Sequence, residues 1–221
     1  MYNKTIILDF DGTIMRLFTN YDLKQTALMV HNYLKEYDVD FAPEKDVFDA
    51  FSLVSSKSLP SSLKEKLLDA VNKILTKAEM EALNSGIITE GFDDFIAFVN
   101  KHNLKLGIAS NNSGECILEF LNRFCKDLNV PVVGRVARHP ELMKPNTYSL
   151  EQIATLLSTK NDDIVFVGDN IRDYQCAKSF GADFIALTPT PKKRERIISN
   201  GLDTKKVKIV NDFRELIGIL A

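Results

Sequence analysis

Two aspartates, one residue apart, follow the first apolar run of the chain in the stretch "TIILDFDGT". Asp9 and Asp11 are predicted to end a buried strand, where side chains two residues apart face the same way. Because like charges that close disfavour each other's ionisation, such a pair needs a bound cation or a retained proton. Asp and Gly are also common turn residues, but the pattern Asp-x-Asp-Gly-Thr is rare by chance. The pair therefore indicates a functional site that holds either a cation or a proton.

Four further polar groups stand in a comparable sequence context. Ser110 ends "LKLGIAS", Lys144 lies in "ELMKPN", and Asp169 and Asp173 lie in "DIVFVGDNIRD". Singly, they could be a helix N-cap, a surface lysine and acids at a turn and a helix start. Together with the first pair they resemble a site for a hard cation and a phosphate group, with Mg²⁺ as the expected cation. Metal and phosphate would then explain why the two adjacent carboxylates are tolerated.

The elements that must position these groups are short apolar runs alternating with helical patterns, which predicts an α/β fold. We expect a Rossmann-like, doubly wound, mostly parallel sheet, whose carboxyl edge gathers the polar groups. One of its helices is expected to start at a capping box formed by Asn112 and Glu115. The predicted strands lie near residues 7, 107, 133, 166, 185 and 209.

Residues 15–87 interrupt this alternation with three helical segments and no predicted strand. The second segment is expected to open at Pro43, and the third at a cap formed by Ser62 and Glu65. We interpret this stretch as a small helical cap domain inserted in a catalytic core made of residues 1–14 and 88–221. An insertion that leaves from the carboxyl edge would cover the site as a lid and exclude water.

Composition limits the classes of function. The chain has 221 residues, 45% of them hydrophobic, and a formal charge of −2. This charge gives no field that would attract nucleic acid or an anionic membrane, and no apolar run is long enough to span a bilayer. The three cysteines have no CxxC spacing, and no secretory signal is recognised, so we expect reduced thiols and a cytoplasmic protein. A monomer or a homodimer is expected.

The stretches "DFDGT", "IASN", "KP" and "GDNIRD" resemble, in this order, the four motifs of the haloacid dehalogenase-like hydrolases. The helical insertion is similar to the cap of the phosphoglycolate phosphatase-like branch. This resemblance implies a Mg²⁺-dependent phosphatase that hydrolyses a small phosphorylated metabolite through an aspartyl-phosphate.

The resemblance also implies a role for each matching residue. Asp9 would be the nucleophile, and Asp11 the general acid and base, which requires a raised pKa. Dehalogenating relatives lack an acid at the position of Asp11, so its presence favours phosphoryl chemistry. The implied phosphate-binding residues are Thr13, Ser110, Asn111 and Lys144. The implied metal ligands are Asp9, the backbone carbonyl of Asp11, and Asp169, with Asp173 ordering the loop or a metal-bound water.

Two other functions use similar residues. A phosphosugar mutase would share the core, and a non-catalytic phospho-accepting domain also combines carboxylates, Mg²⁺ and a lysine. Within the lid, Arg16, Lys57 and Lys64 are candidates for binding a second anionic group of the substrate. We expect the run "KKRER" at residues 192–196 to be a solvated helix face, and Arg135, Arg138 and His139 to lie outside the site.

Overall fold

Six apolar runs form one sheet in residues 4–221, the part of the chain that this computed structural model describes. The strands are β1 (Thr5–Leu8), β4 (Leu106–Ala109), β5 (Val132–Val133), β6 (Ile164–Gly168), β7 (Asp183–Leu187) and β8 (Lys208–Val210). Their order in the sheet is β5-β4-β1-β6-β7-β8, and every neighbouring pair is parallel. The predicted α/β fold with a mostly parallel sheet is confirmed, and β1 lies at its centre.

Helices cover both faces of the sheet because side chains alternate along the strands. Ile6 and Leu8 of β1 belong to one buried cluster, whereas Ile7 between them belongs to the cluster on the opposite face. The first face is covered by α4 (Phe92–Lys101), α5 (Gly114–Phe124) and α9 (Phe213–Leu220). The second face is covered by α6 (Tyr148–Leu156), α7 (Ile171–Phe180) and α8 (Pro191–Ser199). Two short 3₁₀ turns, η1 (Pro140–Leu142) and η2 (Asn161–Asp163), complete the core.

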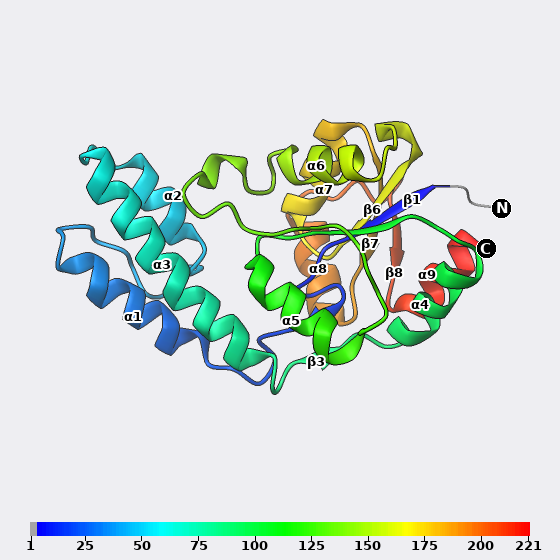
Figure 1. Ribbon diagram of the computed structural model, residues 1–221, viewed down its shortest axis with the longest axis horizontal. Coiled ribbons are helices and arrows are strands. Elements are labelled where there is room, and N and C mark those ends of the chain that lie inside the picture. Colours follow the sequence, from blue (N-terminus) through cyan, green and yellow to red (C-terminus); the bar gives the residue numbers. More distant parts are fainter. Residues whose placement is uncertain (1–3) are drawn as a thin grey trace.

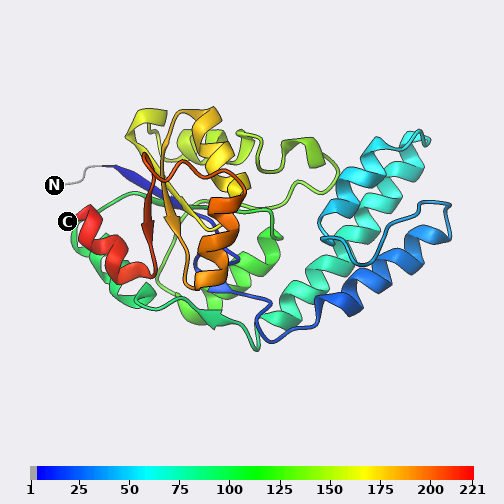
Figure 2. The ribbon, with the colours of Figure 1, turned by 180° about the vertical axis from the view of Figure 1, so that it is seen from behind.

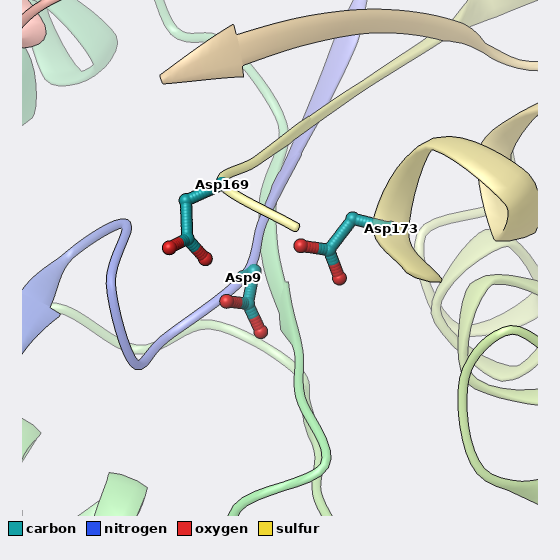
Figure 3. A group of neighbouring side chains, drawn as sticks. All are labelled: Asp9, Asp169 and Asp173. Carbon is teal, nitrogen blue, oxygen red and sulfur yellow. The ribbon is translucent and has the colours of Figure 1, made fainter. Parts of the chain in front are cut away.

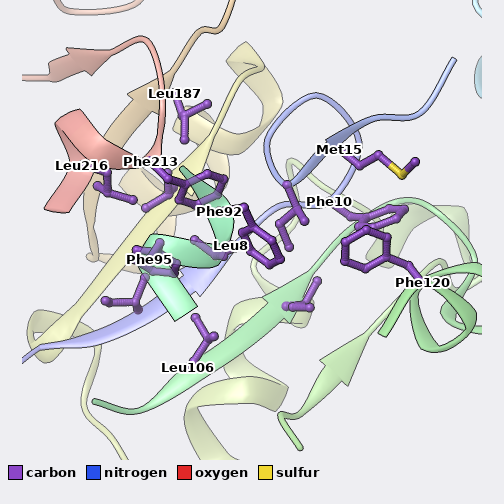
Figure 4. Packing of buried hydrophobic residues seen from close by; sticks show 14 of the residues in the cluster. Leu8, Phe10, Met15, Phe92, Phe95, Leu106, Phe120, Leu187, Phe213 and Leu216 are labelled. Atoms are coloured by element: carbon purple, nitrogen blue, oxygen red, sulfur yellow. The ribbon is translucent and has the colours of Figure 1, made fainter. Parts of the chain in front are cut away.

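Aromatic side chains fill the first of these two layers (Figure 4). The ring of Phe213 in α9 packs against those of Phe92 and Phe95 in α4, with centroids 5.1 and 5.0 Å apart. Phe10 meets Phe120 of α5 edge to face at 5.2 Å. Since Phe10 stands between Asp9 and Asp11, this contact anchors the loop that carries both aspartates.

Three helices between β1 and α4 form a separate unit on one side of the core (Figures 1 and 2). They are α1 (Leu23–Lys35), α2 (Asp49–Ser56) and α3 (Ser61–Ala82). Their apolar faces share a buried cluster of their own, which includes Val30, Phe51 and Val71. Among residues 4–221, none of the helices combines the length and apolar character that a membrane span requires.

The expectation of no strand in residues 15–87 is wrong. Two short strands, β2 (Met15–Arg16) and β3 (Ile87–Ile88), pair antiparallel where the chain leaves and re-enters the core. The backbone N–H and C=O groups of the two crossing segments form hydrogen bonds with each other. The sequence pattern of either segment alone could not reveal this pairing. The division into core and cap at residues 15 and 87 stays a prediction, and this ribbon lies at both of its ends.

Three expected helix starts are also wrong. Helix α5 is capped by Ser113, whose side chain accepts from the Cys116 amide, because Asn112 is used in other contacts. Helix α3 begins at Ser61, directly after Pro60 and without a side-chain cap, so the expected Ser62 cap lies inside its first turn. Helix α2 begins only at Asp49, and Pro43 belongs to a turn that precedes it.

Candidate active site

Three carboxylates meet at the carboxyl edge of the sheet, where neighbouring parallel strands end. Asp9 follows β1, Asp169 follows the adjacent β6, and Asp173 lies in the first turn of α7 (Figure 3). One oxygen atom from each lies within 4.8 Å of the other two. Carboxylate oxygens at this spacing suit a hard divalent cation, so the donor set fits Mg²⁺.

Lys144 lies between two of these carboxylates, Asp9 and Asp173. Its ammonium group is 2.6 Å from Asp9 Oδ1, 2.6 Å from Asp173 Oδ1 and 3.1 Å from the Ala109 carbonyl oxygen. Burial alone would lower the pKa of Lys144, but the charges of Asp173 and Asp9 outweigh it and raise the pKa. Lys144 therefore stays cationic and offsets part of the negative charge of the cluster.

Ser110 and Asn111 follow the end of β4. The Ser110 hydroxyl lies 2.9 Å from Asp9 Oδ1 and 3.0 Å from Asn112 Oδ1, and its single proton serves one of them at a time. The side-chain amide of Asn111 forms two hydrogen bonds with the backbone of Lys144. Its Oδ1 accepts from the Lys144 N–H at 2.9 Å, and its Nδ2 donates to the Lys144 carbonyl oxygen at 3.1 Å. Both residues line the cavity, and the side chain of Asn111 fixes the backbone that carries the lysine.

Asp11 lines the same cavity but is not one of the three clustered carboxylates. Its Oδ1 accepts a hydrogen bond of 2.9 Å from the Leu17 amide, which holds the carboxyl at the cavity wall. Burial raises the pKa of Asp11 to about 7; Lys193 opposes this effect, and the charges of Asp169 and Asp9 add to it. A carboxyl that titrates in this range can give and take a proton near neutral pH.

Lys193, at the start of α8, forms an ion pair with Asp169 that the sequence did not predict. The expectation that residues 192–196 form only a solvated face is wrong, because Lys193 lines the cavity. Gly12 makes room for this pair: its φ is +94°, and a Cβ atom there would overlap Lys193 Nζ and Asp169 Oδ2. Burial and the charge of Asp9 raise the pKa of Asp169, while Lys193 lowers it.

Asp173 uses its two oxygens for two different purposes. Oδ1 accepts from Lys144, and Oδ2 accepts from the Asn170 amide at 3.0 Å, which completes a capping box at the start of α7. Gly168 lets the carboxyl come this close, since a Cβ atom there would lie 2.6 Å from that of Asp173. The contacts suit a residue that orders the loop after β6.

Thr13 does not fit its predicted role. Its side chain is fully buried, its hydroxyl has no hydrogen-bond partner, and it does not line the cavity. The turn that brings Asp11 to the cavity wall directs the Thr13 side chain into the protein interior. A hydroxyl two residues after an aspartate suggested a phosphate ligand, but sequence spacing does not reveal the direction of a side chain in an irregular turn.

A buried ion pair that the sequence did not predict joins α3 to the loop after β5. The guanidinium of Arg135 lies 2.7 Å from Glu79 Oε1, and both side chains are fully buried. Glu79 also accepts hydrogen bonds from Asn112 Nδ2 at 3.0 Å and from the Ser113 amide at 3.1 Å. Arg135 and Arg138 lie outside the cavity, as expected, but both contact α3, Arg135 through Glu79 and Arg138 through Asp69.

The site opens into a cavity of about 1240 Å³ between the sheet edge and the helical unit. Core residues of the carboxylate cluster line one side of it, and residues of α1 and of the segment before α2 line the other. Of the three proposed lid cations, only Arg16 lines this cavity. Lys64 instead donates to the Ser55 carbonyl oxygen at 2.8 Å.

Comparisons with known proteins agree with this architecture. A model of the haloacid dehalogenase-like hydrolase family matches residues 6–187. A protein of Synechococcus elongatus named phosphoglycolate phosphatase is 26% identical over 202 residues, which is 89% of each chain.

Solved structures show the same fold over the whole chain. A predicted phosphoglycolate phosphatase of Haemophilus somnus superposes with a TM-score of 0.66 at 20% identity, covering 100% of this chain and 99% of that one. A predicted phosphatase of Clostridium acetobutylicum gives a TM-score of 0.68 at 16% identity, with the same coverage. The family match covers most of the chain, and the relative spans its core and its helical unit. The chain therefore belongs to the haloacid dehalogenase-like hydrolases, and it is similar over its core and its helical unit to a protein named phosphoglycolate phosphatase.

Proposed function

We propose that this protein is a Mg²⁺-dependent phosphatase that hydrolyses a small phosphorylated metabolite through an aspartyl-phosphate on Asp9. The observation that carries the proposal is the meeting of Asp9, Lys144 and Ser110 beside a second carboxyl, Asp11, whose pKa is raised to about 7. A fixed carboxylate nucleophile and a nearby proton donor are the two groups that such a reaction requires.

The proposed reaction has two steps. In the first, a carboxylate oxygen of Asp9 bonds to phosphorus, the ester bond breaks, and Asp11 gives its proton to the leaving oxygen. In the second, Asp11 takes a proton from a water molecule that attacks phosphorus, and the phosphate leaves Asp9. Lys144 and Ser110 stabilise the negative charge on the phosphate, since both already reach Asp9 Oδ1.

Mg²⁺ would be held by Asp9, the Asp11 carbonyl and Asp169, and when bound it supplies positive charge next to the phosphate. The spacing of the acidic oxygens supports this assignment, with Asp173 ordering the loop. The cavity and the relatives' names support a small substrate; phosphoglycolate is the first compound to test. The cytoplasmic location, the absence of nucleic-acid and membrane partners, and the state of monomer or homodimer stay predictions.

The test is phosphate release from a panel of phosphorylated metabolites, with Mg²⁺ present and after its removal by EDTA. We expect turnover that EDTA abolishes and added Mg²⁺ restores, and a loss of at least about 1000-fold in kcat for Asp9→Asn. Asp162→Asn, which changes an exposed aspartate outside the cavity, is the matched control. If no ester is hydrolysed with Mg²⁺ present, or if Asp9→Asn keeps full activity, the proposal is wrong.

A further inference from the structure

Arg16 lines the cavity at the hinge between the core and the helical unit, in strand β2. Its Nε atom is buried and has no hydrogen-bond partner. Within residues 4–221, the guanidinium forms no hydrogen bond, ion pair or ring contact with any other side chain or with the backbone. Arg16 is therefore a cation at the cavity wall whose two Nη groups, which are not buried, are left for a ligand.

Three other cations of the same cavity are paired, and the remaining four, Lys24, Lys45, Lys192 and Arg196, are exposed to water, whereas Arg16 is half-buried. Lys144 is paired with Asp9, Lys193 with Asp169, and Arg172 with Asp49 of α2. An arginine that is partly removed from water and has no partner lowers the stability of the fold. Such an arrangement is understandable when a ligand completes the hydrogen bonds of the guanidinium.

The local backbone places Arg16 on the side of the cavity where the leaving group would lie. The amide of Leu17, the next residue, donates to Asp11 Oδ1 at 2.9 Å. Asp11 is the group that we propose to protonate the leaving oxygen, so a substituent on that oxygen extends from Asp11 into the surrounding cavity. Arg16 and Phe18 flank Leu17 in the chain, and both line this cavity.

We propose that Arg16 binds a carboxylate on the leaving group of the substrate, so that the enzyme selects phosphomonoesters that carry this second anionic group. One guanidinium neutralises one negative charge, and its planar donors match the two oxygens of a carboxylate. This inference rests on the proposed phosphatase function and adds to it the residue that recognises the leaving group.

The experiment compares two small esters that differ in the second anionic group. Phosphoglycolate carries a carboxylate, and ethyl phosphate has a methyl group in its place. The ratio of their kcat/KM values is measured for the wild type and for Arg16→Gln, Arg16→Lys and Arg194→Gln. Arg194 is the matched control, because it is an exposed arginine of α8 that does not line the cavity.

We expect the wild type to prefer phosphoglycolate, and the ratio to fall by about 10- to 100-fold in Arg16→Gln, the range for a lost hydrogen bond between charged groups. Arg16→Lys keeps the charge without the planar pair of donors and should give an intermediate ratio. Arg194→Gln should keep the wild-type ratio. A purely structural role of Arg16 would instead lower the thermal midpoint and affect both esters alike.

The inference is overturned if wild-type enzyme shows no preference for the carboxylated ester, or if the ratio in Arg16→Gln stays within about twofold of wild type. Should Arg16→Gln not fold, Arg16→Lys alone decides the question through the same ratio. These outcomes differ from a failure of the proposed function, in which the wild type would release phosphate from neither ester nor from any other member of the panel.

Discussion

The buried pair of Glu79 and Arg135 gives the sharpest prediction about stability. Glu79→Gln keeps the size and shape of the side chain but replaces Oε2 with an NH₂ group. In the wild-type protein, Glu79 Oε2 accepts hydrogen bonds from Arg135 Nη2 and from the Ser113 backbone amide, each at 3.1 Å. In the variant, donors would face donors at both positions, and the charge of Arg135 would lose its partner.

The magnitude follows from these contacts. A lost hydrogen bond to a charged group costs about 1.5–3 kcal/mol, and a lost neutral one about 1 kcal/mol. Because both side chains are fully buried, water cannot replace the missing partner. We therefore expect Glu79→Gln to lower the free energy of unfolding by about 3–5 kcal/mol, the range for breaking one side of a buried ion pair.

The same loop and helix offer a matched control. Arg138 pairs with Asp69 of α3 at 2.6 Å, but this arginine and its partner are 54% and 49% exposed. Arg138→Gln should cost less than about 1 kcal/mol, because exposed ion pairs contribute little. The two arginines thus separate the effect of burial from that of merely joining this loop to α3.

Urea and thermal unfolding, followed by circular dichroism, measure both variants. Glu79→Gln should lower Tm by about 6–20 °C, the shift that 3–5 kcal/mol produces in a chain of this size. Arg135→Met should rescue part of this loss when combined with Glu79→Gln, because the unpaired charge is then gone. A loss below about 1 kcal/mol for Glu79→Gln, or an equal loss for Arg138→Gln, would refute the reasoning.

Two further predictions concern ionisable groups. Because Asp11 must be protonated to serve the leaving oxygen, kcat/KM should fall as pH rises through about 7, the raised pKa of its carboxyl. Asp11→Asn should remove this limb of the pH profile and reduce kcat by about 10²- to 10⁴-fold; a variant with an unchanged profile would contradict the assignment. Burial raises the pKa of Cys176 to about 12 and of Cys125 to about 11, and raises that of Cys116 as well. Ellman's reagent at pH 8 should therefore react slowly with the native protein and quickly with all three thiols in urea; a fast native reaction would count against this burial.

Much of the fold could be predicted because its signals are local. The run from Thr5 to Leu8 is apolar at every position except the first, which suits a strand buried on both faces, and Asp9 follows at its end. In a parallel sheet such strand ends share one edge, so the meeting of Asp9 with Asp169 followed from sequence alone. Helix starts were predicted less well, because a capping residue such as Asn112 can be recruited by a partner far away in the chain.

Contacts between distant segments carried no such local signal. Glu79 lies in the last turn of an amphipathic helix and Arg135 in a loop, and neither position suggested a fully buried pair. Lys193 belongs to a charged run typical of a solvated helix, and only the pairing of β7 with β6 brings α8 to Asp169. The order of the strands in the sheet decides such contacts, and no single stretch of the sequence predicts this order.

The sequence by itself determined the α/β fold, the helical insertion and the set of polar groups that end the strands, because periodicity and strand-end chemistry depend on neighbouring residues. Only the tertiary structure decided which cations find a partner. Lys193 and Arg135 acquire one across the fold, whereas Arg16 lines the cavity without any within residues 4–221. The physical reason is that desolvation and charge pairing depend on what surrounds a side chain in space, and those neighbours come from distant parts of the chain.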